Sequence, residues 1–340
     1  MTGIVNGIGL ASALGGYEAA TTAYRANARG FKRERSVIGV DGMGVTMAAA
    51  IPMPEMRDIL DRLVTLISDA VADLPVPMSS NIPITLCLPP WLRETDLTEP
   101  LAQRLAQGAL RQTSELRLAW EDDTPFASVL TAALAQEEER LVAVLDTYLL
   151  PELLDLLAAT GRIQSSRQPH GFIPGEAALV FRVTPQGADM APAGVGHIAG
   201  ARIAHDETDL TRPEGLLGEI IADLWAEAID ARTDRLLLDL NGERWRAEEA
   251  AHCLARHADR LDAALTGDPE TPALNFGYTG IAAAPLMIAL ALTDGPKPPE
   301  RTEEWSLISA SLYGGTRMVI RTVRGVAQPS QPVTARGNPP

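Results

Sequence analysis

Residues 170–183 read HGFIPGEAALVFRV, in which a glycine-containing turn leads directly into an apolar run. A single glutamate, Glu176, stands between Gly175 and two alanines. A buried carboxylate is costly unless hydrogen-bond donors satisfy it, so this glutamate needs a structural reason. The apolar run ends at Pro185 and is typical of a strand that is covered on both faces.

The rest of the chain alternates between amphipathic helices and short apolar strands. Residues 54–75 place apolar side chains at helical spacing behind an acidic first turn, which predicts a helix. Residues 81–90 and 140–149 predict buried strands, and residues 306–323 predict a closing hairpin. This alternation predicts an α/β fold whose strands are mostly parallel and covered by helices on both faces.

A loose stretch of small residues, from about 187 to 200, separates two segments with similar alternation. We therefore expect two similar halves, residues 1–190 and residues 191–325. Residues 326–340 are rich in proline, glutamine and serine, and they predict a disordered tail.

Composition limits the classes of function. The 340 residues include 44 acidic and 29 basic side chains, for a net charge of −15. This charge would repel phosphate backbones and anionic lipid, so we expect neither a nucleic-acid nor a membrane partner. The sequence has no run of eighteen apolar residues and its start lacks the features of a signal peptide, which predicts a cytoplasmic protein.

No cofactor or metal site is predicted. Cys87 and Cys253 fall in an apolar strand and a helical stretch, where free cysteine is commonly a small buried apolar residue. His252 and His257 are five residues apart, so they do not share a helix face as a ligand pair would. The glycine pattern of residues 7–12 lacks the third glycine of a dinucleotide-binding turn.

Several segments, taken in order, resemble the β-ketoacyl synthase branch of the thiolase fold. The matches follow the order of that family and span nearly the whole chain. The resemblance implies a thiolase-like α/β fold in which the two halves form an αβαβα layered arrangement. The matching segments are the opening strand–turn–helix at 4–31, the strand at 141–149, the GEGA-like strand at 170–183, the GHT-like helix start at 275–292 and the GFGGTNA-like hairpin at 311–320.

The resemblance also assigns positions to a former active site. Glu176 matches the glutamate of the GEGA motif, which supports the active-site loops from behind. The cysteine nucleophile would fall at about Leu118–Thr124, where this chain has Asp122 and neither cysteine nor serine. The two catalytic histidines would fall at Asn241 and Tyr278, and the lysine that usually precedes GHT is also missing. The resemblance therefore implies a pseudoenzyme whose vestigial site is lined by Asp122, Asn241 and Tyr278.

Three functions remain open at this stage. The favoured hypothesis is a non-catalytic adaptor that binds an effector or spike component for type VI secretion, because short ketosynthase-like chains of this kind resemble such accessory proteins. The alternative is a partner of an active β-ketoacyl synthase, similar to a chain length factor, in fatty acid or polyketide assembly. The third is an acyltransferase of the ketosynthase type that uses other residues. The resemblance also implies a homodimer formed through the sheet edge beside the nucleophile helix.

Overall fold

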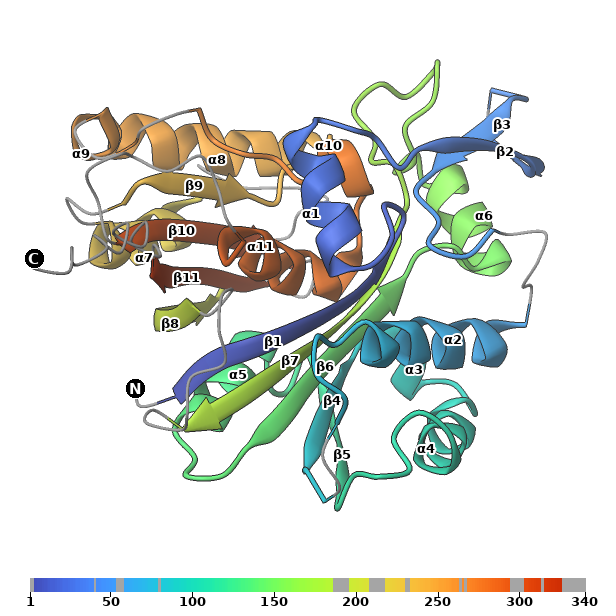
Figure 1. The fold of residues 1–340 in the computed structure, drawn as a ribbon. Coiled ribbons are helices and arrows are strands. Elements are labelled where there is room, and N and C mark those ends of the chain that lie inside the picture. The colour runs from blue at the N-terminus through green and yellow to red at the C-terminus, as the bar shows by residue number, and fades with distance from the viewer. Residues whose placement is uncertain are drawn as a thin grey trace, which may run out of the picture.

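A nine-stranded sheet forms the frame of the computed structural model (Figure 1). Its strand order is β5-β4-β6-β7-β1-β8-β11-β10-β9. The structure describes residues 3–39, 41–52, 58–78, 81–185, 196–207, 218–229, 233–262, 265, 268–293, 303–312 and 315–325. The strands of the sheet are β1 (Gly3–Ser12), β4 (Ile84–Leu88), β5 (Leu116–Trp120), β6 (Arg140–Thr147), β7 (Glu176–Pro185), β8 (Gly196–His205), β9 (Arg235–Leu238), β10 (Glu303–Ser311) and β11 (Thr316–Gly325).

The strands form two groups with matching directions. In the first group β1, β4, β5 and β6 run the same way and β7 runs against them. In the second group β8, β9 and β10 run the same way and β11 runs against them. The two groups meet at a single antiparallel pair, Val5 with Gly196. Most strands within each group run in the same direction, which confirms the predicted excess of parallel strands. The reversed strands, β7 and β11, lie inside the groups, so most pairs of neighbouring strands are antiparallel.

Helices cover both outer faces and fill the space between the two groups. On one outer side α2 (Ile59–Ala72) contacts β1, β6, β7 and α4 (Thr98–Gln107). Between the groups, α5 (Phe126–Leu134) contacts β1, β6, β7 and β8, and α11 (Ala283–Ala291) contacts β7 as well as β9, β10 and β11. On the other outer side α7 (Glu219–Ala228) contacts β8, β11 and α8 (Arg244–Arg256). These contacts form the αβαβα layers that the resemblance implies.

The composition of α11 explains its central place. Eight of its nine residues are buried, so it is apolar on every side, as expected for a helix enclosed by other elements. It packs with α5 in the largest apolar cluster, which includes side chains from both groups of strands. By contrast, α2 is amphipathic and begins at Asp58, whose side chain accepts a hydrogen bond from the Asp61 amide at 2.8 Å.

The remaining elements lie at the ends of the layers. A two-stranded sheet, β2 (Lys32–Ile38) with β3 (Gly44–Met47), projects beside α6 (Pro151–Ala159), on the side of the molecule away from α7 (Figure 1). No helix among the described residues is long and apolar enough to cross a membrane. The shorter elements are α1 (Tyr17–Arg25), α3 (Pro90–Arg93), α9 (Ala258–Asp262), α10 (Ala273–Phe276) and the 3₁₀ turn η1 (Gly280–Ala282).

The predicted elements at 54–75, 81–90 and 306–323 correspond to α2, β4 and the β10–β11 hairpin. The sequence analysis missed β5 and β2. The predicted boundary at 190 and the predicted tail at 326–340 both lie outside the described residues, so the division into domains stays a prediction.

Candidate functional site

Glu176 opens β7 and is completely buried. Its two carboxylate oxygens accept hydrogen bonds from Nε and Nη2 of Arg62, each at 2.6 Å. The Ile51 amide and the Thr147 hydroxyl each donate to it at 3.0 Å. Four donors therefore satisfy the carboxylate, which explains the glutamate at this turn. Through this pair Glu176 holds α2, which carries Arg62, against the start of β7.

The backbone beside Glu176 touches the predicted position Tyr278. The Gly175 amide donates to the Tyr278 carbonyl oxygen at 3.0 Å. A Cβ atom at Gly175 would lie 2.7 Å from the Phe276 carbonyl oxygen, so only glycine permits this approach. The Glu176 side chain itself points to α2, and its side-chain partners do not include Tyr278.

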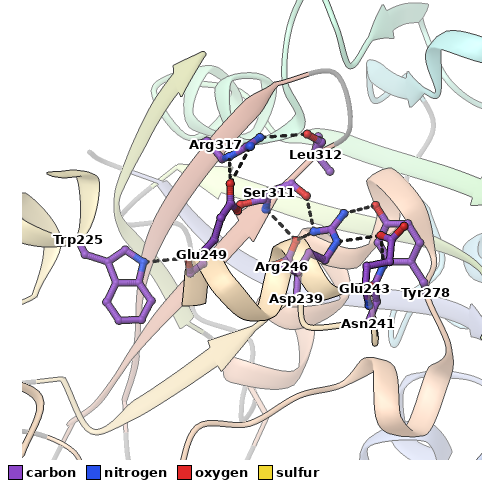
Figure 2. A network of polar contacts seen from close by, with 11 residues as sticks. Trp225, Asp239, Asn241, Glu243, Arg246, Glu249, Tyr278, Ser311, Leu312 and Arg317 are labelled. Atoms are coloured by element: carbon purple, nitrogen blue, oxygen red, sulfur yellow. Dashed lines mark hydrogen bonds and ion pairs between the residues drawn. The ribbon is translucent and has the colours of Figure 1, made fainter. Parts of the chain in front are cut away.

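Tyr278 and Asn241 belong to one buried polar network around Arg246 (Figure 2). Nη2 of Arg246 donates to the Tyr278 hydroxyl at 2.8 Å. Asn241 donates to Glu243 at 2.9 Å, and Glu243 also pairs with Nε of Arg246 at 3.5 Å. The structure thus brings together the two positions that the resemblance assigns to the catalytic histidines.

The same guanidinium joins the ends of two strands. Arg246 is 1% exposed and donates to the Asp239 carboxylate, which follows β9, and to the Ser311 carbonyl oxygen, which ends β10. The Ser311 amide donates to Asp239 at 2.7 Å. Arg246 therefore links α8, two strand ends and the Tyr278 loop.

Little space remains beside this network. Tyr278 packs against Tyr148 and Phe172, with ring centroids 5.3 and 5.2 Å away. The cavity that Tyr278 lines together with Asp239 has a volume of about 10 Å³, which is room for about one water molecule. Burial raises the pKa of Tyr278 to about 12, so the phenol stays neutral at physiological pH.

Asp122 lies apart from this network. Its side chain is 40% exposed and pairs with Arg93 at 3.1 Å on the surface. The preceding residue, Glu121, is 2% exposed and accepts a hydrogen bond from the Phe126 amide at the start of α5, at 2.8 Å. Glu121 belongs to the acidic run 121–123, which precedes α5, and its carboxylate caps that helix, whereas the resemblance pointed to Asp122.

A second buried carboxylate occupies the corresponding position before α11. Asp146, near the end of β6, accepts a hydrogen bond from the Ile281 amide in η1 at 3.0 Å. The Thr147 amide and the Trp91 indole donate to its other oxygen at 2.8 and 3.1 Å. A Cβ atom at Gly280, where φ is +59°, would lie 1.9 Å from the Asp146 carboxylate, so glycine is needed for this contact. The starts of both central helical segments are thus occupied by carboxylates.

These two carboxyl groups hold their protons more tightly than usual. Burial, together with the charge of Asp146, raises the pKa of Glu121 to about 8. Burial raises the pKa of Asp146 to about 6, although its hydrogen bonds act in the opposite direction. At neutral pH Glu121 is therefore mostly protonated and Asp146 mostly ionised, and the charge of Asp146 opposes the formation of a thiolate or an oxyanion nearby.

The two cysteines are both buried. Cys87 on β4 belongs to the same apolar cluster as Phe126 at the start of α5. Burial and the charge of Glu121 raise the pKa of the Cys87 thiol well above its ordinary value. Burial raises the pKa of Cys253, on α8, to about 12. Both thiols therefore stay protonated at neutral pH. Across the described residues, no group of three or more His, Cys, Asp or Glu is placed to hold a metal ion.

Comparison with solved structures identifies the fold. The chain aligns with a structure described as the ishigamide ketosynthase/chain length factor at a TM-score of 0.69 and 16% identity, over 96% of this chain and 100% of that chain. It aligns with the ketosynthase from module 6 of the bacillaene synthase of Bacillus subtilis 168 at 0.69 and 13% identity, over 96% and 72%. A third match is AntDE:AntF, a type II PKS acyl-carrier protein in complex with its ketosynthase bound to the hexaketide, at 0.69 and 13% identity, over 96% and 99%.

These similarities show that the chain has the thiolase-like fold of ketosynthases, which confirms the predicted fold class. No known protein family and no curated protein matches the sequence. The structural neighbours include chain length factors and ketosynthases, and none of the descriptions concerns secretion. At 11–16% identity these neighbours show the fold alone, and the predicted type VI secretion adaptor has no support among them.

The buried Arg62–Glu176 pair gives a first testable prediction. Arg62→Met leaves Glu176 buried without its counter-ion, and we expect a loss of about 3–5 kcal/mol in the free energy of unfolding. As a control, Arg104→Met removes an exposed ion pair with Asp61 and should cost less than about 1 kcal/mol. Denaturant unfolding compares the two. Equal losses would contradict the prediction, and adding Glu176→Gln to Arg62→Met should recover part of the loss.

Glu121 gives a second prediction, on pH dependence. Its pKa is raised in the folded protein, so its ionisation destabilises the fold, and this penalty grows as the pH rises from about 5 to above 8. The stability advantage of Glu121→Gln over the natural protein should grow by about 2–4 kcal/mol between pH 6 and pH 9. Denaturant unfolding at both pH values measures this difference. The exposed neighbour Asp122→Asn is the control, and a variant Glu121→Gln that keeps the natural pH dependence would refute the assignment.

Proposed function

We propose that this chain is a non-condensing subunit of the chain-length-factor type, which pairs with an active ketosynthase. One observation carries the proposal: buried carboxylates, Glu121 and Asp146, occupy the starts of the two central helical segments. A condensing enzyme needs a cysteine thiolate at a helix start, where the helix dipole favours the anion. The charge of Asp146 opposes that chemistry.

The residues at the two histidine positions support the same proposal. A general base or oxyanion donor in a ketosynthase has to be free to bind the reacting atoms. Tyr278 instead accepts a hydrogen bond from Arg246, and Asn241 is engaged with Glu243. The cavity beside Tyr278, about 10 Å³, is too small for an acyl chain. We infer that the protein contributes shape and binding surface, and that the partner supplies the chemistry.

The strand β5 provides an edge for pairing with that partner. It ends the strand order of the sheet, so one side of its backbone has no neighbour among the described strands. Leu116, Leu118 and Trp120 are half-buried, whereas Arg117 is exposed. An open sheet edge of this kind is a natural surface for pairing with another chain. We propose that a ketosynthase pairs with this edge. Pairing with a second copy of this chain would instead give the homodimer that the sequence analysis predicts.

Site-specific crosslinking tests the partner. Because Cys87 and Cys253 are buried, Arg117→Cys introduces the accessible thiol, and a maleimide–benzophenone attached to it should on irradiation insert into a C–H bond of whatever lies beside β5 in native cells. We expect a crosslinked ketosynthase, identified by mass spectrometry, and no such product from Ala255→Cys on the exposed side of α8. A product containing only this chain would favour the homodimer. A secretion effector or spike protein would favour the adaptor and contradict the proposal.

A mass measurement tests the absence of condensation chemistry. The purified protein is incubated with an acyl N-acetylcysteamine thioester and its intact mass is recorded. We expect no covalent acyl adduct, because both thiols are buried and protonated. An active ketosynthase treated in the same way is the positive control. A stoichiometric adduct on any residue would contradict a non-condensing role.

A further inference from the structure

A cleft with a volume of about 430 Å³ lies between the β2–β3 hairpin and the segment after α6. This volume falls within the range of pockets that bind ligands, about 300–1,000 Å³. Val45 and Ile163 are buried apolar residues of its lining, and Asp41 accepts hydrogen bonds from the amide and hydroxyl of Ser166 at 3.0 and 2.8 Å. The cleft lies away from the Arg246 network and shares no lining residue with it.

The cleft follows the outer edge of β3. It is lined by four consecutive residues, 43–46, and side chains of neighbouring strand residues point to opposite faces. Because the cavity contacts all four residues, 43–46, it extends along the backbone at the edge of β3. The Ala48 amide, just beyond β3, donates to the Pro174 carbonyl oxygen at 2.9 Å on this edge. Amides two and four residues earlier, at Thr46 and Gly44, point to the same side as the Ala48 amide, because hydrogen-bonding direction alternates along a strand.

A basic stretch runs from the end of α1 into β2 of this acidic protein. Residues 25–35 contain five basic side chains and one acidic side chain, whereas the whole chain has a net charge of −15. The five basic side chains are exposed, and none of them forms an ion pair with another residue in the part of the chain that the structure describes. They are Arg25, Arg29, Lys32, Arg33 and Arg35. Arg33 lines the cleft directly.

Exposed apolar side chains gather at the same place. Ile38 and Met43, near the hairpin tip, are 58% and 51% exposed, and Leu156 on α6 is 59% exposed. Ile38 and Met43 belong to the hairpin that lines the cleft, and the hairpin shares a buried apolar cluster with α6. Exposed apolar groups beside unpaired positive charges are typical of a protein-binding surface.

We propose that the edge of β3 and its cleft bind an extended acidic segment of a partner protein by strand addition. The partner's backbone would pair with Gly44 and Thr46, and its alternate side chains would divide between the apolar cleft and the basic hairpin. The free arginines require negative charge in the partner. A nucleic acid fits less well, because its phosphate backbone gains nothing from apolar contacts in the cleft. The net negative charge of this chain also repels it. This inference does not depend on the proposed partnership with a ketosynthase.

A peptide-binding experiment tests the proposal. The probe is a fluorescein-labelled ten-residue peptide of alternating glutamate and valine, titrated by fluorescence anisotropy. We expect it to bind, and we expect the double variant Arg33→Glu with Arg35→Glu to weaken binding by about tenfold or more. Arg111→Glu, which reverses an exposed arginine on another surface, is the matched control and should bind like the natural protein.

Hydrogen exchange separates strand addition from attraction between charges alone. Binding of the peptide should slow amide exchange in residues 43–47, and Thr46→Pro, which removes an outward amide at a strand edge, should weaken binding. Circular dichroism confirms that each variant is folded. Absence of binding, equal binding of the alternating lysine–valine peptide, unchanged exchange at 43–47, or tighter binding of a labelled single-stranded DNA would each overturn the proposal.

Discussion

The buried guanidinium of Arg246 is the interaction on which the centre of this protein depends. A charge that is 1% exposed is stable only if carboxylates and carbonyl oxygens surround it, and Asp239, Glu243 and the Ser311 carbonyl oxygen do so. Because these partners come from different strand ends and loops, one side chain fixes their relative positions. The Tyr278 hydroxyl completes the set. In an enzyme this region would have to admit substrate. Here the hydrogen bonds of Arg246 hold its strand ends and loops together.

Much of the fold can be predicted from the sequence because its buried strands are uniformly apolar. The β7 strand, for example, follows directly from the apolar run between Glu176 and Pro185. The edge strand β5 cannot be predicted in this way. Its side chains are only partly buried, and Arg117 interrupts the apolar pattern. In the turn that follows β5, the resemblance selects exposed Asp122, whereas the buried carboxyl group is the preceding Glu121, which caps α5.

The candidate site shows a different limit. The resemblance placed Asn241 and Tyr278 close together, and the structure brings them into one network. Nothing in the sequence marks Arg246 as the centre of that network, because arginine in a helix next to glutamates is usually at the surface. Its burial follows only from the fold, which brings Asp239 and Ser311 to the same point. Long-range pairing of charges, unlike apolar periodicity, leaves no local pattern in the sequence.

The strands β5 and β3 each lie at the edge of a sheet among the described strands, and their edges differ in a way that bears on specificity. An open edge invites non-specific association unless charge or cover protects it. On β5 the exposed Arg117 supplies charge at the centre of the edge, which suits a large partner that brings its own acidic group. On β3 the walls of the cleft supply cover, since Asp41, Ile163 and Ser166 line it. A cleft of about 430 Å³ beside β3 suits one extended segment, whereas the edge of β5 has no such cleft among its described residues, so the two proposed partners would use different surfaces.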